Sequence, residues 1–191
     1  MKIEEDQEII CGFNVVEAVL NLSPKSSKTL FVLESKSSSR VERISSLALS
    51  NEVQVLSKTK DFFLTYCKDQ NHQGFALLCT KRKEENESLL DNLLEKESLL
   101  LLILDHITDP HNVGACLRSA AAANVDAVIV PKNRSCHLTP TVRKISSGGS
   151  ELVPFIIVTN LVRTIKKMKQ SDVNIVGAEK SGEIDYKELV L

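Results

Sequence analysis

The sequence predicts an α/β protein made of two units. Apolar, strand-like segments alternate with helix-like segments on both sides of a charge-dense stretch at residues 81–98. Such alternation favours sheets covered by helices, and in the second half of the chain it favours a parallel sheet. The charge-dense stretch is nearly free of strand formers, so we expect an acidic linker at 83–97 between units at 1–82 and 98–191.

The spacing of apolar residues predicts the elements of the first unit. Helical spacing marks helices, and short apolar runs mark strands. In chain order we expect a helix at 13–22, a strand at 28–34, a helix at 40–50, a strand at 52–56, a helix at 59–67 and a strand at 74–80.

The second unit shows the alternation more clearly. A short helix is expected within the linker at 89–95. It is followed by a strand at 98–104, a helix at 113–123, a strand at 125–130, a helix at 141–147, a strand at 154–158, a helix at 161–169 capped by Asn160, and a strand at 173–177. Ligands of parallel sheets bind beyond the carboxyl ends of the strands, where the loop DHITDPHN lies.

Composition indicates a soluble, cytoplasmic protein. The hydrophobic fraction is 42%, the net charge is −1, and the longest apolar run, at 99–104, is too short to span a bilayer. The five cysteines form no C-x-x-C pair, so we expect reduced thiols. The histidines lack metal-ligand spacing, and no metal is predicted. The overall charge gives only weak support for nucleic-acid binding.

The turn after the predicted strand at 98–104 carries the main candidate site. Asp109-Pro110 favours a turn, and Asn112 falls where a helix cap belongs. Arg118 follows six residues later, about 9 Å along a helix axis. A helix N-terminus with an amide and a guanidinium favours an anion such as phosphate. From spacing alone, a simple cap and a surface arginine are the favoured interpretation.

Two further loops contain candidate residues. Lys132 and Arg134 follow the next predicted strand at the same sheet edge, which indicates either a phosphate-rich partner or a solvated turn. Gly148 and Gly149 precede the carboxylate of Glu151, which fits close approach of a ligand or an ordinary helix end equally well.

Three segments resemble a known family. LDHITDPHNVGACLRSAAAANVDAVIVPKNRS closely resembles the first signature motif of the SpoU/TrmH (SPOUT) family of RNA ribose 2′-O-methyltransferases. CGFNVVEAVL and HQGFALL resemble the family's RNA-binding N-terminal domain, which is similar to ribosomal protein L30e. KISSGGSELVPFIIVTNLVRTI matches the family's order of elements. The D-P-x-N-x-G-x-x-x-R motif is specific enough to outweigh the simple-cap interpretation of Asn112 and Arg118.

The resemblance implies a SPOUT-type methyltransferase domain whose C-terminal segment forms a trefoil knot that binds S-adenosylmethionine. The family's two cofactor motifs, G-x-E-x-x-G and S-L-N-V-x-x-A, are not found in their expected places before Leu191. We therefore expect a C-terminally truncated domain that lacks most of the knot, with the cofactor-binding residues beyond Leu191.

The implied function is S-adenosylmethionine-dependent 2′-O-methylation of the ribose of a guanosine in 23S rRNA. Members of the family generally form homodimers. The alternative is a non-catalytic RNA-binding module. The resemblance gives catalytic roles to the motif residues, and Glu151 is added as a residue that holds the local loop: Asn112, Arg118 and Glu151. The residues expected to contact RNA phosphates are Lys36, Arg40, Arg43, Lys132 and Arg134.

Overall fold

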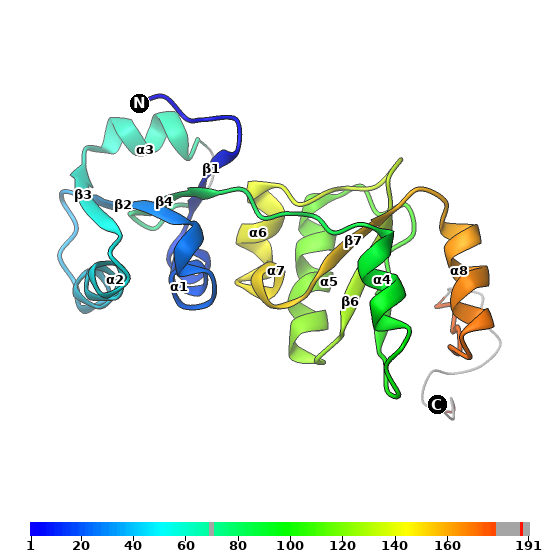
Figure 1. Cartoon of the computed structure of the whole chain (residues 1–191). Coiled ribbons are helices and arrows are strands. Elements are labelled where there is room, and N and C mark those ends of the chain that lie inside the picture. Colours follow the sequence, from blue (N-terminus) through cyan, green and yellow to red (C-terminus); the bar gives the residue numbers. More distant parts are fainter. Residues whose placement is uncertain (69–70, 179–187, 189–191) are drawn as a thin grey trace.

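The computed structural model describes residues 1–68, 71–178 and 188, which form two lobes side by side (Figure 1). The first lobe holds a sheet of strand order β1-β4-β2-β3, in which β2 and β3 are parallel and the other pairs are antiparallel. Its strands are β1 (Gln7–Cys11), β2 (Ser27–Leu33), β3 (Gln54–Lys58) and β4 (Phe75–Thr80). Its helices are α1 (Phe13–Leu22), the 3-10 turn η1 (Pro24–Ser26), α2 (Ser39–Ser50) and α3 (Lys60–Tyr66).

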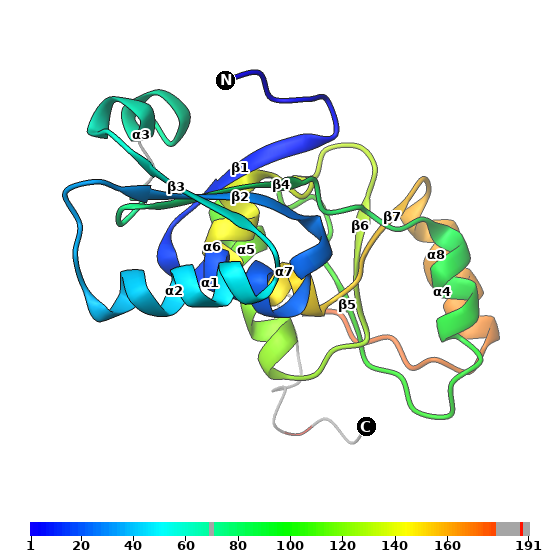
Figure 2. The same ribbon diagram turned by 60° about the vertical axis from the view of Figure 1, so that its left-hand side comes forward.

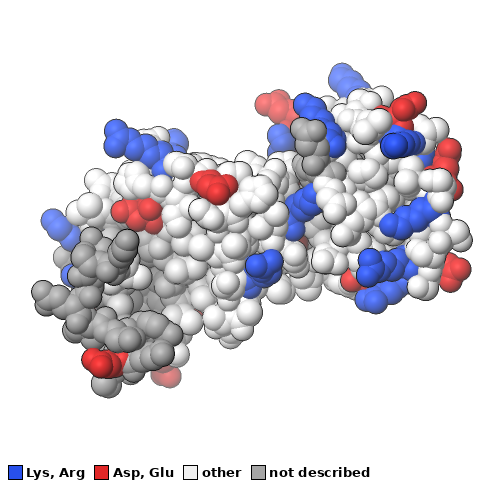
Figure 3. Space-filling model, turned by 180° about the vertical axis from the view of Figure 1, so that it is seen from behind, with Lys and Arg blue, Asp and Glu red and all other residues white. Residues whose placement is uncertain are grey.

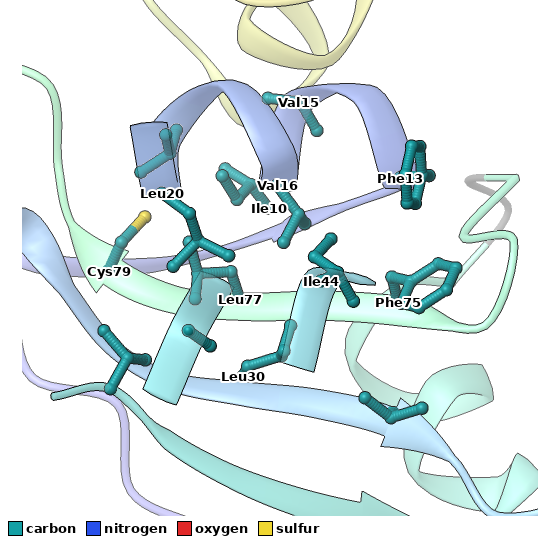
Figure 4. Packing of buried hydrophobic residues seen from close by; sticks show 14 residues of the cluster. Ile10, Phe13, Val15, Val16, Leu20, Leu30, Ile44, Phe75, Leu77 and Cys79 are labelled. Carbon is teal, nitrogen blue, oxygen red and sulfur yellow. The ribbon is translucent and has the colours of Figure 1, made fainter. Parts of the chain in front are cut away.

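Helices cover both faces of the first sheet. Neighbouring residues of a strand point to opposite faces, so Ile10 packs with α1 and α2 whereas Ile9 packs with α3. Figure 2 shows α3 on one side of this sheet and α1 and α2 on the other. Val16 and Leu20 lie four residues apart on one face of α1 and meet Ile44 of α2 in the larger core (Figure 4).

The second lobe holds a three-stranded parallel sheet with its strands in chain order. The strands are β5 (Leu101–Ile103), β6 (Ala127–Pro131) and β7 (Phe155–Val158). The helices are α4 (Glu87–Leu93), α5 (Pro110–Ala122), α6 (Pro140–Ser146), α7 (Gly149–Leu152) and α8 (Leu161–Gln170). Val128 and Val130 pack with α5 and α6, whereas Ala127 and Ile129 pack with α4 and α8. Both faces of the sheet are therefore buried, as parallel sheets require.

The predicted α/β class and the parallel second sheet are confirmed. Each predicted helix is present with its ends within three residues of the expected ones. Asn160 caps α8 as expected, because its Oδ1 accepts a 2.9 Å hydrogen bond from the Arg163 backbone N–H.

Two strand assignments differ from the sequence analysis. β1 was not predicted, since its five residues are too few to display a clear alternation. The strand predicted at 173–177 is wrong: residues 173–178 have no regular structure. Val173 and Ile175 nevertheless pack on the face of the second sheet that α4 and α8 cover. The apolar pattern thus indicated burial, but not a backbone hydrogen-bonding partner.

The acidic segment at 83–97, expected to be a linker between the units, docks on the second lobe. Glu85 exchanges two backbone hydrogen bonds of 2.8 Å with β7 and so forms a one-residue parallel bridge along that strand. The Glu87 carboxylate accepts a 2.9 Å hydrogen bond from the Thr159 backbone N–H and pairs with Arg163 at 3.0 Å. The bond from Thr159 is the main reason why the pKa of Glu87 is lowered.

A disulfide joins Cys11 of β1 to Cys67, the residue that follows α3. Their Cα atoms are 6.0 Å apart, although 56 positions separate them in the sequence. The prediction of reduced thiols is therefore wrong for this pair. The described free thiols are those of Cys79, Cys116 and Cys136. Sequence spacing gave no signal for the bond, because it depends on the packing of α3 against the sheet.

A buried charge cluster joins the two lobes. We name Glu8, Cys79, Arg143 and Glu151 the junction cluster. Arg143 of α6 is 1% exposed, and its guanidinium donates to Glu8 of β1 at 2.5 Å and to Glu151 of α7 at 2.8 Å. The Cys79 sulfur of β4 lies 3.5 Å from the same guanidinium, and burial raises the pKa of its thiol to about 11. One cation thus binds groups from both lobes.

Two further hydrogen bonds reinforce the junction cluster. The second oxygen of Glu151 accepts a 3.1 Å hydrogen bond from the Ser23 hydroxyl, which lies between α1 and η1. Arg82, which follows β4, donates to the Ser150 carbonyl at 3.2 Å. The carboxylate of Glu151 is therefore held from both lobes.

Two glycines allow the short helices to approach α5 closely. A Cβ on Gly114 of α5 would lie 2.6 Å from Cβ of Ile145 in α6. A Cβ on Gly149 of α7 would lie 2.6 Å from the carbonyl oxygen of Leu117 in α5. Any larger residue would push α6 or α7 away from α5.

We expect Arg143→Met to lower the free energy of unfolding by about 3–5 kcal/mol, because it leaves two buried carboxylates without their cation. Urea-induced unfolding measures this loss. Lys169→Met, at an exposed position of α8, is the matched control, and a loss equal to that of the control would contradict this role of Arg143.

We expect Gly149→Ala to destabilise the protein by about 1–3 kcal/mol, because the new methyl group meets backbone atoms of α5 that cannot move independently. Gly177→Ala is the control, since a Cβ at Gly177 meets no atom within 4 Å. Thermal unfolding followed by circular dichroism compares the two variants. Equal melting temperatures for the two variants would show that α7 can shift away from α5 without loss of stability, and would contradict the prediction.

Candidate active site at the carboxyl edge of the second sheet

The loops that follow β5 and β6 meet at one edge of the second sheet. Parallel neighbouring strands end at the same edge, and the Cys136 backbone N–H donates a 2.8 Å hydrogen bond to the Ile107 carbonyl across the two loops. The pKa of the Cys136 thiol is raised, first by burial and then by the charges of Asp109 and Glu84. This contact places the start of α5 next to the loop that carries Lys132 and Arg134.

Asp109, not Asn112, caps α5. The Asp109 side chain accepts a 2.9 Å hydrogen bond from the His111 backbone N–H, and Pro110 occupies the first turn. The prediction that Asn112 is the cap is therefore wrong, because the helix begins three residues earlier than expected. Asn112 instead lies in the first turn with an exposed side chain. Its amide is free of any capping role and is available to a ligand.

Arg118 lies on the surface of α5, beside the junction of the lobes. Its side chain is exposed and forms no hydrogen bond or ion pair with any residue of the described ranges. A Cβ on Gly149 would lie 3.1 Å from the Arg118 Cα, so α7 packs directly against this part of α5. Six residues separate Arg118 from Asn112, about 9 Å along the helix and about 120° around it. A bound molecule, rather than direct contact, must connect the two side chains.

Lys132 and Arg134 are both exposed in the loop after β6. His137 orders this loop, because its Nε2 lies 3.0 Å from the Lys132 carbonyl oxygen and its Nδ1 lies 3.1 Å from Glu84. The hydrogen bond with Glu84 is the main cause of the raised pKa of His137. The acidic linker thus supports a loop of the candidate site.

Glu151 lies in the junction cluster, where it is 8% exposed and bound to Arg143. Its carboxylate is therefore already occupied by a cation and by hydroxyl groups. The structure brings Glu151 near Arg118 only through the backbone of α7, since Gly149 is the residue in contact with α5.

The three predicted cations of the first lobe lie in different environments. Lys36 donates to the Gln73 carbonyl and its ammonium lies 4.7 Å from the centre of the Phe75 ring. Arg40 lies 5.2 Å from the centre of the Phe13 ring. Arg43 forms a 2.6 Å ion pair with Glu17 of α1, so its charge is already balanced.

The sequence analysis missed two cations of α6, Arg143 and Lys144. Neither belongs to a motif, and a basic pair in a short helix is ordinarily a solvated surface. Burial lowers the pKa of Lys144. The pKa of His72 in the first lobe is lowered by burial and by the charges of Lys36 and Lys144, which places these cations around one site.

The described ranges lack two kinds of feature. These ranges contain no group of three or more His, Cys, Asp and Glu side chains that could hold a metal ion. None of their helices combines the length and the apolar character needed to cross a bilayer.

Family models match both parts of the chain. The model of the SpoU rRNA Methylase family matches residues 99–191, and the model described as RNA 2′-O ribose methyltransferase substrate binding matches residues 9–85. The two matches coincide with the second and first lobes.

Curated relatives match nearly the whole chain. The 23S rRNA (guanosine-2′-O-)-methyltransferase RlmB of Neisseria meningitidis is 42% identical over 182 residues, which cover 94% of this chain and 72% of the relative. RlmB of Coxiella burnetii is 41% identical over 186 residues, which cover 95% of this chain and 73% of the relative.

Solved structures share the fold at lower identity. An RNA 2′-O ribose methyltransferase superposes with a TM-score of 0.72 at 19% identity, over 97% of this chain and 67% of the other. The AdoMet-bound rRNA methyltransferase of Sinorhizobium meliloti superposes with a TM-score of 0.70 at 19% identity, over 97% of this chain and 66% of the other. The chain therefore belongs to the SpoU rRNA methylase family, as its first motif predicted.

Proposed function

We propose that this protein acts in the S-adenosylmethionine-dependent 2′-O-methylation of a guanosine ribose in 23S rRNA. The observation that carries the proposal is the 42% identity, over both lobes, to an enzyme named for that reaction. The guanidinium of Arg118, which is exposed on α5 and unpaired among the described residues, supports it. The proposed place of the reaction is the cytoplasm, and a homodimer is the proposed assembly, as the family resemblance implies.

S-adenosylmethionine supplies an electrophilic methyl group when bound. Two pockets of the described residues lie elsewhere, one over β2 and β3 and one between α1 and Ser147. The expectation that cofactor-binding residues lie beyond Leu191 concerns residues outside those described, and it stays a prediction.

The described residues supply the acceptor side of the reaction. Arg118 cannot serve as a general base, because a guanidinium keeps its proton in proteins. We assign it two tasks that need a fixed positive charge: holding a phosphate next to the target ribose and stabilising the negative charge that develops on the 2′ oxygen. Asn112 then orients the ribose by hydrogen bonding. Glu151 positions α7, and through it α5, without touching the substrate.

RNA capture involves cations from both lobes. Lys36 and Arg40 in the first lobe and Lys132 and Arg134 in the second are the proposed phosphate contacts. Arg43 is a weaker contact, because Glu17 already balances its charge. The proposed units are an RNA-binding domain at 1–82 and a methyltransferase domain at 98–191. Glu85 and Glu87 fix the segment between them to the second lobe.

A non-catalytic RNA-binding module is the second candidate function. One observation favours it: the acceptor groups Asn112 and Arg118 are present, whereas the motifs G-x-E-x-x-G and S-L-N-V-x-x-A are not found in this sequence in their expected places. Such a module would bind rRNA through the same cations and leave it unmethylated.

We expect Arg118→Lys to lower the rate of methyl transfer by about 100-fold while the dissociation constant for RNA changes by less than about threefold, because an ammonium cannot replace the planar guanidinium in the transition state. The assay follows tritiated methyl groups from S-adenosylmethionine into a 23S rRNA transcript. Resistance of the product to alkaline cleavage locates the methyl group on the 2′ oxygen.

Arg163→Lys serves as the control for this assay. Arg163 is exposed on α8, which covers the face of the sheet opposite α5, and it is paired with Glu87. An unchanged rate for Arg118→Lys would remove the guanidinium-specific role. Tight RNA binding without any methyl transfer by the unmodified chain would instead identify the non-catalytic module.

A further inference from the structure

Lys144 of the second lobe reaches the first lobe at the start of α1. Its Cε lies 3.8 Å from the position that a Cβ on Gly12 would take. Lys36 approaches the same region from the other side, with its Nζ 3.5 Å from the corresponding position on Gly74. Gly12 and Gly74 belong to adjacent segments, because the Gly12 N–H donates a 3.0 Å hydrogen bond to the Phe75 carbonyl. Cations from both lobes therefore gather around one turn.

The cations of this site lack acidic partners, in contrast to other cations nearby. Within the described ranges Lys144 forms no hydrogen bond or ion pair, although it is half-buried. Lys36 donates only to a carbonyl oxygen, and Arg40 rests on the Phe13 ring. A partly buried ammonium without a counter-ion is unfavourable unless an anion joins it.

Neighbouring carboxylates are already engaged. Glu17 pairs with Arg43, and Glu151 pairs with Arg143. These pairs balance the cations that have structural roles. The charges of Lys36, Arg40 and Lys144 are left for an anion from outside the chain.

A groove lies on α1 near this site, and Asn14, two residues after Gly12, is one of its lining residues. It measures about 430 Å³, within the range of ligand pockets, and it lies between the exposed face of α1 and Ser147. Its lining residues are Asn14, Glu17, Ala18, Asn21, Leu22 and Ser147. Gly148 packs on Ala18 at the bottom of the groove, and the next residue, Gly149, packs on the backbone at Arg118. Seen from behind, Lys and Arg side chains gather over the first lobe and the junction, whereas the adjacent surface of the second lobe is mostly uncharged (Figure 3).

We propose that Lys144, Lys36 and Arg40 form a phosphate-binding site shared by the two lobes, which holds the backbone of an RNA strand whose next nucleotide lies in the groove on α1. The inference rests on the proposed function and assigns to Lys144 a role in substrate binding. Asn14, Asn21 and Ser147 supply neutral polar groups for that nucleotide. The ligand class is a phosphodiester of RNA, because three cations of the two lobes gather around one turn beside a groove lined by neutral polar groups.

The test compares Lys144→Gln with Lys169→Gln in binding a fluorescein-labelled 23S rRNA fragment over a series of KCl concentrations. Lys169 lies on α8, far from the junction in Figure 1, and its substitution removes the same charge. Loss of one phosphate contact should make the slope of log K against log[KCl] shallower by about 0.7 for Lys144→Gln. The slope of Lys169→Gln should equal that of the unmodified chain. Urea unfolding of both variants verifies that the fold is kept.

A second measurement uses lysine acetylation read by mass spectrometry. Lys144 should be acetylated in the free protein and protected by the RNA fragment, together with Lys36, while Lys169 is acetylated equally in both states. Equal slopes for the two variants, with no protection of Lys144, would overturn the shared site while leaving the proposed function intact. Absence of RNA binding by the unmodified chain would overturn both.

Discussion

The junction cluster is the interaction on which the arrangement of this protein depends. A guanidinium buried between two carboxylates is favourable only when its geometry is fixed, since each charge has lost its water. Arg143 meets that condition by binding groups from β1 and α7 at once. The orientation of the first lobe relative to α5 follows from this contact, so the distance between the proposed RNA-binding cations and Arg118 is set by a buried ion cluster rather than by the linker.

Cations in this protein divide by whether an acid balances them. Arg143, Arg163 and Arg43 have carboxylate partners and hold elements together. Arg118 and Lys144 have none among the described residues. A net charge near zero therefore conceals a local excess of positive charge, which explains why composition gave little sign of a nucleic-acid partner.

Much of the fold was readable from the sequence because it depends on local patterns. The helical period predicted α1 and α8, and continuous apolar runs predicted the buried strands of the second sheet. The first motif identified Arg118 as a candidate residue, but the cap of α5 is Asp109 and not the predicted Asn112. Contacts that depend on the packing of distant segments were missed, namely the junction cluster and the disulfide of Cys11. Arg143 carries no local signal, since its importance arises only when β1 and α7 meet around it.

The backbone hydrogen bonds of Glu85 have a consequence for the behaviour of the sheet edge. β7 is the last strand of the second sheet, and an uncovered edge of this kind is a template for pairing with another chain. Glu85 occupies part of that edge and is flanked by further acidic residues. The segment between the lobes thus covers part of the β7 edge. Its acidic side chains repel the same segment of a second copy and so disfavour edge-to-edge aggregation.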